Sequence, residues 1–113
     1  MKRGEVWLIN LDPTVGMEIR KTRPAVIVNS DALGKLPLNV IVPITDWKEN
    51  YAVAPWMVQV KPTTTNGLSK VSSADCFQVR SVSRTRFVKK LGILKSEIMK
   101  EIGRGLSAVL ELR

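Results

Sequence analysis

Short apolar runs separated by polar turns occupy the first three quarters of the chain. Many of these runs are rich in β-branched residues, which favour a pleated sheet. The pattern predicts a series of short strands at residues 6–11, 23–30, 39–45, 56–60, near 70–73 and at 76–82. Polar loops are expected at residues 12–22 and 46–55, and a turn or a single helical turn at 31–34.

The spacing of apolar residues changes near the end of the chain. Apolar side chains recur at spacings of three and four positions, at Ile98, Met99, Ile102, Leu106, Val109 and Leu110. This spacing predicts one amphipathic helix, with Ser96 as its N-cap. Gly103 and Gly105 each weaken a helix by roughly 1 kcal/mol relative to Ala, so a close contact with the sheet is expected there. Short strands followed by one helix predict a small, strongly curved β-barrel, a mainly β fold.

Composition limits the size of the protein and the kind of partner it binds. The chain has 113 residues, is 44% hydrophobic and carries a formal charge of +8. A single domain spanning residues 1–113 is expected. The charge favours a polyanionic partner, which could be nucleic acid, an acidic protein or an anionic membrane surface, although solubility alone also explains it. No signal peptide or membrane span is expected, because the apolar run at 6–11 is too short.

The titratable residues exclude several chemistries. The chain has no histidine, which removes the usual general base and the usual metal ligand. Its carboxylates lack metal-site spacing, and no glycine-rich phosphate loop precedes a helix. We therefore expect neither a metal nor a cofactor. The single cysteine, Cys76, cannot form an intrachain disulfide. A buried, inert thiol in a reducing cytoplasm is expected.

Basic residues fall into two groups along the chain, and aromatic residues lie beside some of them. The groups are Arg20, Lys21 and Arg23, and then Arg80, Arg84, Arg86, Lys89 and Lys90, while Trp47 adjoins Lys48. Cations for phosphates and aromatic rings for bases are typical of proteins that bind single-stranded RNA. A solvated basic face is the alternative. Trp7 and Trp56 are expected in the core, whereas Trp47 fits core or surface equally well.

Arg23 stands at the start of a predicted buried strand, followed by Pro24, so its cation is attached to a rigid element. RNA can be cut without a cofactor when its 2′-hydroxyl attacks the adjacent phosphate. That step needs a proton acceptor, help for the leaving oxygen, and positive charge at the phosphate. Glu18, Arg23 and Thr45 could supply these groups if the loops bring them together. A salt bridge from Arg23 to Glu18 at the sheet edge is an equally good interpretation of these residues.

Four sequence blocks resemble one known family. They are residues 3–7 (RGEVW), residues 16–19 with 21–27 (GMEI and KTRPAVI), residues 42–45 (VPIT) and residues 78–82 (QVRSV). In this order they span most of the chain. The chain therefore resembles the MazF/PemK family of toxin endoribonucleases.

This resemblance implies a CcdB-like, SH3-like barrel, a homodimer and a cytoplasmic mRNA interferase of a type II toxin–antitoxin system. It implies metal-independent, sequence-specific cleavage of single-stranded RNA to 2′,3′-cyclic phosphate and 5′-hydroxyl ends, and a MazE-like antitoxin. By position, Arg23 and Thr45 match the catalytic arginine and threonine of the family, and Glu18 matches the acidic residue of its mobile loop. The residues expected to bind RNA are Arg20, Lys21, Trp47, Lys48, Gln78, Arg80, Arg84 and Arg86.

Phe77 departs from the family pattern, which often has an acidic residue directly before the glutamine of the fourth block. Core packing is expected for Phe77, and stacking on an RNA base is the alternative. Two other functions remain as alternatives: a CcdB-like gyrase-inhibiting toxin and a non-catalytic RNA-binding barrel. The gyrase-inhibiting type lacks the 21–24 block and depends on a terminal tryptophan, which the final residues 110–113 do not contain.

Overall fold

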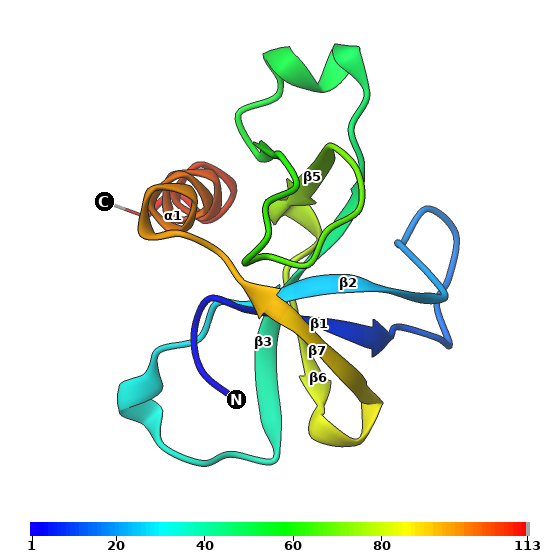
Figure 1. Cartoon of the computed structure of the whole chain (residues 1–113), viewed down its shortest axis with the longest axis vertical. Helices are drawn as coiled ribbons and strands as arrows, with labels where there is room; N and C mark the ends of the chain where they lie inside the picture. Colours follow the sequence, from blue (N-terminus) through cyan, green and yellow to red (C-terminus); the bar gives the residue numbers. More distant parts are fainter. Residues whose placement is uncertain (113) are drawn as a thin grey trace.

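The computed structural model describes residues 1–112, in which seven antiparallel strands form a strongly bent sheet with one α-helix packed on it (Figure 1). The strands are β1 (Glu5–Asn10), β2 (Thr22–Ile27), β3 (Leu38–Asp46), β4 (Met57–Val60), β5 (Ser72–Asp75), β6 (Arg80–Ser83) and β7 (Phe87–Ile93). The helix is α1 (Ser96–Leu110), and 3-10 turns lie at η1 (Asp31–Leu33), η2 (Glu49–Val53), η3 (Cys76–Gln78) and η4 (Arg84–Arg86). The expected mainly β fold with a C-terminal helix is confirmed.

Strand β3 belongs to both halves of the sheet. The strand order is β4-β5-β3-β2-β1-β7, and β6 pairs with the first part of β3. Up to Pro43 the strand pairs with β2, with Ala25 opposite Pro43. From Ile44 onwards it pairs instead with β5, with Ile44 opposite Ala74. The sheet therefore bends at β3, and the strands on its two sides diverge from that point.

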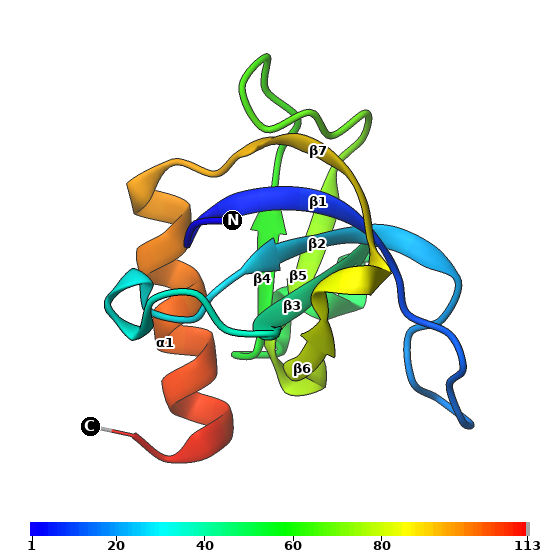
Figure 2. The same ribbon diagram turned by 90° about the horizontal axis from the view of Figure 1, so that it is seen from below.

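Apolar clusters lie on both faces of the central strands. Val26 and Ile44 belong to the larger cluster, which α1 covers with the fully buried Ile102. Ala25 and Ile27, on the other face of β2, join a smaller cluster with Ile9. Figure 2 shows α1 and the β1–β2 loop on opposite sides of the molecule. The central strands are thus buried on both faces, which explains why their sequences are almost continuously apolar.

The strands predicted from the first half of the sequence are confirmed with shifts of a few residues at their ends. The strand predicted at residues 76–82 is confirmed only from Arg80 onwards, because the chain forms η3 before β6 begins. Strand β7 was not predicted. It forms the outer neighbour of β1 and places Lys89 and Lys90 on the surface, so its sequence lacks a clear apolar alternation.

The C-terminal helix is confirmed, but its predicted cap is wrong. Lys95 occupies the N-cap position without a side-chain hydrogen bond, and Ser96 is the first helical residue. Two aromatic predictions are also wrong, because Trp56 is 37% exposed and Phe77 is 68% exposed. Their rings contact each other edge to face with centroids 5.9 Å apart. Turn η3 carries Phe77 outward, whereas the strand predicted there could have pointed it inward.

Trp7 is half-buried at the margin of the smaller cluster. Its ring meets Phe87 at 5.5 Å, and its Nε1 donates to Glu5 Oε1 at 2.9 Å. Trp7 was expected in the core, and it lies at the edge of the core.

Gly105 of α1 packs closely against Cys76 of turn η3. The Cys76 thiol is fully buried and donates to the Ile102 carbonyl at 3.6 Å. A Cβ atom on Gly105 would lie 2.7 Å from Cys76 Sγ, whereas a Cβ on Gly103 would meet nothing within 4 Å. The expected close packing at a helical glycine is therefore confirmed for Gly105 alone.

Replacing Gly105 by Ala should lower the free energy of unfolding by ~1–3 kcal/mol, because the new methyl group overpacks the contact with Cys76. Gly103→Ala is the matched control and should raise it by about 0.5–1 kcal/mol through helix propensity. Urea unfolding of both variants measures this difference. Equal effects of the two substitutions would contradict the proposed contact.

Burial raises the pKa of the Cys76 thiol to about 12, and the neighbouring Asp75 charge adds to this rise. At pH 8 the folded protein should therefore react with a maleimide far more slowly than the same protein in urea, because the thiolate is the reacting form. Mass spectrometry of the labelled protein follows the reaction. Equal labelling rates with and without urea would show that the thiol is accessible.

Candidate active site

A cavity of about 430 Å³ lies where β2 begins, where β3 ends, and beside residues 67–72, which lead into β5. Arg23 and Thr45 both line it. The register that sets Ala25 opposite Pro43 would, two residues further, set Arg23 opposite Thr45. Strand β3 has by then turned to β5, where Thr45 pairs with Ser73. The two side chains therefore face a gap between diverging strands.

The cavity is predominantly basic. Lys21, Arg23 and Lys70 line it together with one carboxylate, Asp46. Asp46 Oδ1 lies 2.9 Å from Lys70 Nζ. This hydrogen bond lowers the pKa of Asp46 below its usual value, and the charges of Arg23 and Lys48 lower it further. At neutral pH the cavity thus carries three cations and one anion, a balance that suits a phosphate group.

Arg23 is half-buried, and most of its guanidinium is available to a ligand. Its Nε donates to the Arg20 carbonyl at 3.3 Å. Among residues 1–112, no carboxylate oxygen lies within 4.0 Å of its guanidinium nitrogens. The salt bridge from Arg23 to Glu18 considered above does not form in this structure.

Glu18 lies outside the cavity that holds Arg23 and Thr45. It is exposed on the β1–β2 loop, where its Oε1 accepts a hydrogen bond from the Val15 amide at 2.6 Å. It lines a separate cleft of about 440 Å³ with Phe77. The structure brings together two of the three predicted catalytic residues and leaves the third on a neighbouring surface.

Residues of the fourth sequence block hold the β1–β2 loop in place. Gln78 Oε1 accepts from the Ile19 amide at 2.6 Å, and its Nε2 donates to the Met17 carbonyl at 3.3 Å. Arg80 Nη1 donates to the Leu11 carbonyl at 3.2 Å. Arg86, further along the chain, donates to the carbonyls of Asn10 and Asp12. Part of the charge predicted to bind RNA is therefore also used to anchor backbone carbonyls.

The remaining residues predicted to contact RNA do not line the cavity. Trp47 is half-buried against Tyr51, with ring centroids 5.9 Å apart, and does not line the cavity. Lys48 is exposed next to it. Arg20 is exposed, and its carbonyl accepts the hydrogen bond from Arg23. Arg84 lies in turn η4 between β6 and β7.

Comparison with known proteins identifies the family of this chain. Residues 2–110 match the family described as PemK-like, MazF-like toxins of type II toxin–antitoxin systems. The chain belongs to this family. Endoribonuclease MazF9 of Mycobacterium tuberculosis is 34% identical over 120 residues, which cover 99% of this chain and 98% of that protein. Endoribonuclease PemK of Escherichia coli is 34% identical over 112 residues, which cover 97% and 82%.

A solved structure shows the same fold. The crystal structure of MazF from Deinococcus radiodurans matches with a TM-score of 0.80 and 25% identity, covering 98% of this chain and 96% of that one. The agreement extends over nearly the whole toxin, so the bent sheet and its helix are those of the family.

Two residues of the cavity were missed by the sequence reasoning, Asp46 and Lys70. They are separated by more than twenty positions, and only the pairing of β3 with β5 brings them together, with Asp46 opposite Ser72. The one available signal was that Asp46 directly follows Thr45. Among residues 1–112 of the toxin, no cluster of three or more potential ligands could hold a metal ion.

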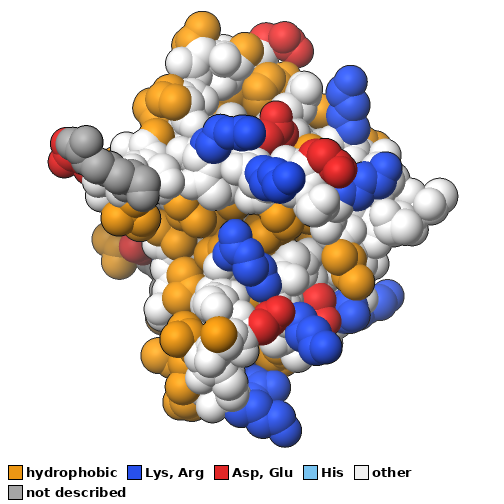
Figure 3. Space-filling view, turned by 90° about the vertical axis from the view of Figure 1, so that its left-hand side faces the viewer, with side chains coloured by type: hydrophobic (Ala, Val, Ile, Leu, Met, Phe, Trp, Pro, Cys, Tyr) orange, Lys and Arg blue, Asp and Glu red, His pale blue; other side chains and the backbone are white. Residues whose placement is uncertain are grey.

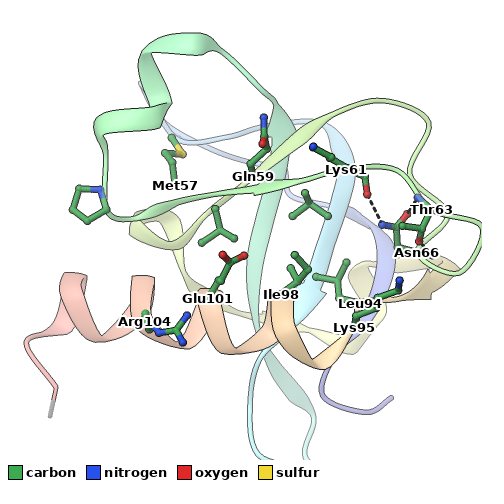
Figure 4. A pocket seen from close by; sticks show the side chains of 13 residues that line it. Met57, Gln59, Lys61, Thr63, Asn66, Leu94, Lys95, Ile98, Glu101 and Arg104 are labelled. Carbon is green, nitrogen blue, oxygen red and sulfur yellow. Dashed lines mark hydrogen bonds between the residues drawn. The ribbon is translucent and has the colours of Figure 1, made fainter.

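A larger cavity of about 570 Å³ lies between β4 and α1 (Figure 4). Ile98 and Glu101 point into it from the helix, and Lys61 and Lys95 lie near one end. None of the predicted site residues lines it. Figure 3 shows basic side chains also scattered over the face of the toxin that carries α1, with apolar and acidic groups between them. Neither cavity size nor positive charge alone locates the site.

Replacing Gln78 by Ala should loosen the β1–β2 loop, because two hydrogen bonds of about 1 kcal/mol each are lost. Hydrogen exchange of the amides between residues 15 and 21 should accelerate by ~10-fold or more. Gln59→Ala on the exposed face of β4 is the control and should leave these amides unchanged. Unaltered exchange in the Gln78 variant would show that the loop is held by other contacts.

Proposed function

We propose that this toxin is a metal-independent endoribonuclease, an mRNA interferase that cuts single-stranded RNA at short sequence motifs. The observation that carries the proposal is the meeting of Arg23 and Thr45 in one basic cavity. The family match and the relatives named endoribonucleases support it. The products would carry a 2′,3′-cyclic phosphate and a 5′-hydroxyl.

Arg23 acts on the phosphate in this proposal. The RNA 2′-oxygen attacks phosphorus, a new P–O2′ bond forms, and the P–O5′ bond breaks. The 2′-hydroxyl passes its proton to a base, the role proposed for Glu18, and the departing 5′-oxygen takes one from water. Negative charge grows on the non-bridging oxygens during this step, and a fixed guanidinium stabilises it. The hydroxyl of Thr45, anchored on β3, orients the phosphate by hydrogen bonding to one of these oxygens.

Glu18 is the third proposed catalytic residue, and its position on the β1–β2 loop means that it cannot reach the phosphate without a movement of the loop. Its carboxylate now accepts a bond from Val15 within the same loop. To reach the RNA bound at Arg23, Glu18 must leave this contact as the loop rearranges. The loop is exposed at Gly16 and Met17, so such a rearrangement disrupts little packing. It does have to displace or carry along the Gln78 hydrogen bonds to Met17 and Ile19.

The partners follow from the family and the charge. We propose a homodimer in the cytoplasm and an antitoxin of the MazE type, whose acidic and apolar residues would cover the basic RNA surface. The exposed Trp56 and Phe77 rings offer apolar surface for such assembly. None of the helices in residues 1–112 has the length and apolar character to cross a membrane.

The proposal is tested by incubating the purified toxin with a long single-stranded RNA in the presence of EDTA and mapping the new ends. Discrete cuts at a shared short motif are expected. Intact RNA would contradict the proposal and favour a non-catalytic RNA-binding barrel or a gyrase-inhibiting toxin. Cleavage that EDTA abolishes would show that a metal takes part.

Arg23→Ala and Thr45→Ala should each lower the cleavage rate by ~100-fold or more, as expected for groups that stabilise charge in the transition state. Arg104→Ala, on the helix, and Thr64→Ala, on an exposed loop, are matched controls and should cleave normally. Melting curves check that all four variants are folded. Full activity of both site variants would remove Arg23 and Thr45 from the mechanism.

A further inference from the structure

The catalytic cavity contains a second fixed cation, Lys70, which the proposed mechanism has not used. Lys70 lies two residues before Ser72, at the entry to β5. Its Nζ is 2.9 Å from Asp46 Oδ1, and both side chains line the cavity with Arg23 and Thr45. The ammonium is thus held against β3, one residue along from Thr45.

The Asp46 carboxylate is suited to anchoring and poorly suited to accepting a proton. Its hydrogen bond to Lys70, with the nearby charges of Arg23 and Lys48, holds the pKa of Asp46 below its usual value. A carboxylate with a lowered pKa stays ionised at neutral pH and is a weak base. A constant negative charge at this position therefore holds the Lys70 ammonium in place.

We propose that Lys70 is a catalytic residue that contacts the scissile phosphate, and that Asp46 is the positioning residue that aims its ammonium. This inference rests on the RNA cleavage proposed above and assigns two further residues to the same site. Lys70 contacts the non-bridging phosphate oxygens from the β3–β5 side of the cavity, and Arg23 contacts them from the β2 side.

The chemistry calls for more than one cation. As the P–O2′ bond forms and the P–O5′ bond breaks, the phosphate passes from one negative charge towards two. A second cation in the same cavity, the Lys70 ammonium held by Asp46, adds to the stabilisation that the Arg23 guanidinium gives. The 2′-hydroxyl proton still leaves to a base and the 5′-oxygen still gains a proton, so Lys70 changes the electrostatics and not the proton balance.

The ion pair contributes little to folding, so replacing either partner tests its catalytic role without unfolding the protein. The side chains of Lys70 and Asp46 are 64% and 55% exposed. Exposed ion pairs add little to stability. A structural explanation of the pair therefore predicts nearly normal melting and nearly normal cleavage when either partner is replaced.

The test compares single-turnover cleavage by Lys70→Met, Lys70→Arg, Asp46→Asn and the double variant Asp46→Asn/Lys70→Met. The substrate is an RNA whose cut site has been mapped with the unaltered toxin. Lys35→Met, on the exposed segment before β3, is the matched control. Binding is measured separately with the same RNA carrying a 2′-deoxy sugar at the cut site, which cannot react.

Lys70→Met should lower the cleavage rate by ~30-fold or more, as for other lost transition-state contacts, while its affinity for the deoxy RNA changes by less than ~3-fold. Lys70→Arg should recover most of the rate because the cation is kept. Asp46→Asn should lower the rate by about 10-fold, and the double variant should be no slower than Lys70→Met, since both substitutions act through one ammonium.

Three results would overturn the assignment. One is a Lys70→Met variant that cleaves as fast as Lys35→Met. Another is a loss of affinity for the deoxy RNA as large as the loss of rate, because this would make Lys70 an ordinary binding cation. The third is a double variant whose fold-loss in cleavage rate equals the product of the fold-losses of the two single variants. If the unaltered toxin cuts no RNA, the proposed function and the Lys70 assignment fall together; if it cuts and Lys70→Met cuts equally well, only the assignment falls.

Discussion

Strand β3 changes its pairing partner between Pro43 and Ile44, and the candidate site depends on this change. If β3 had continued alongside β2, Arg23 and Thr45 would face each other as an ordinary cross-strand pair. Because β3 turns to β5 instead, a cavity opens between them. Pro43 has no amide hydrogen to donate to a neighbouring strand, so this position suits a point where one ladder ends and another begins.

The same sheet separates two uses of positive charge. Arg80 and Arg86 donate guanidinium hydrogen bonds to backbone carbonyls at the base of the β1–β2 loop. Arg23 and Lys70 face the cavity. Arg23 donates only its Nε–H, to the Arg20 carbonyl, so most of its donors are free. Lys70 is held only by the exposed carboxylate of Asp46. The net charge of the chain therefore overstates what is available to RNA. The local hydrogen bonds, and not the number of basic residues, distinguish an anchoring arginine from one that can meet a phosphate.

Sequence reasoning succeeded where one local property determines the outcome. β-branched runs predicted the central strands, and a spacing of three and four predicted α1. It failed where the outcome depends on distant partners. Core packing was expected for Phe77, yet the turn η3 exposes it. Family position located Arg23 and Thr45 but could not show that Glu18 lies in another cleft. The Asp46–Lys70 pair needs the β3–β5 register, which no local pattern contains.

In the proposed mechanism the RNA 2′-hydroxyl is the nucleophile, and the toxin supplies positioned charge without a metal. The most direct measurement uses an oligonucleotide with a single ribose at the mapped cut site, incubated with the toxin in EDTA and weighed by mass spectrometry. We expect a 5′ fragment with the mass of a 2′,3′-cyclic phosphate, and no cleavage when that one ribose is replaced by deoxyribose. Cleavage of the all-deoxy strand, or an initial fragment ending in a 3′-hydroxyl, would contradict this mechanism.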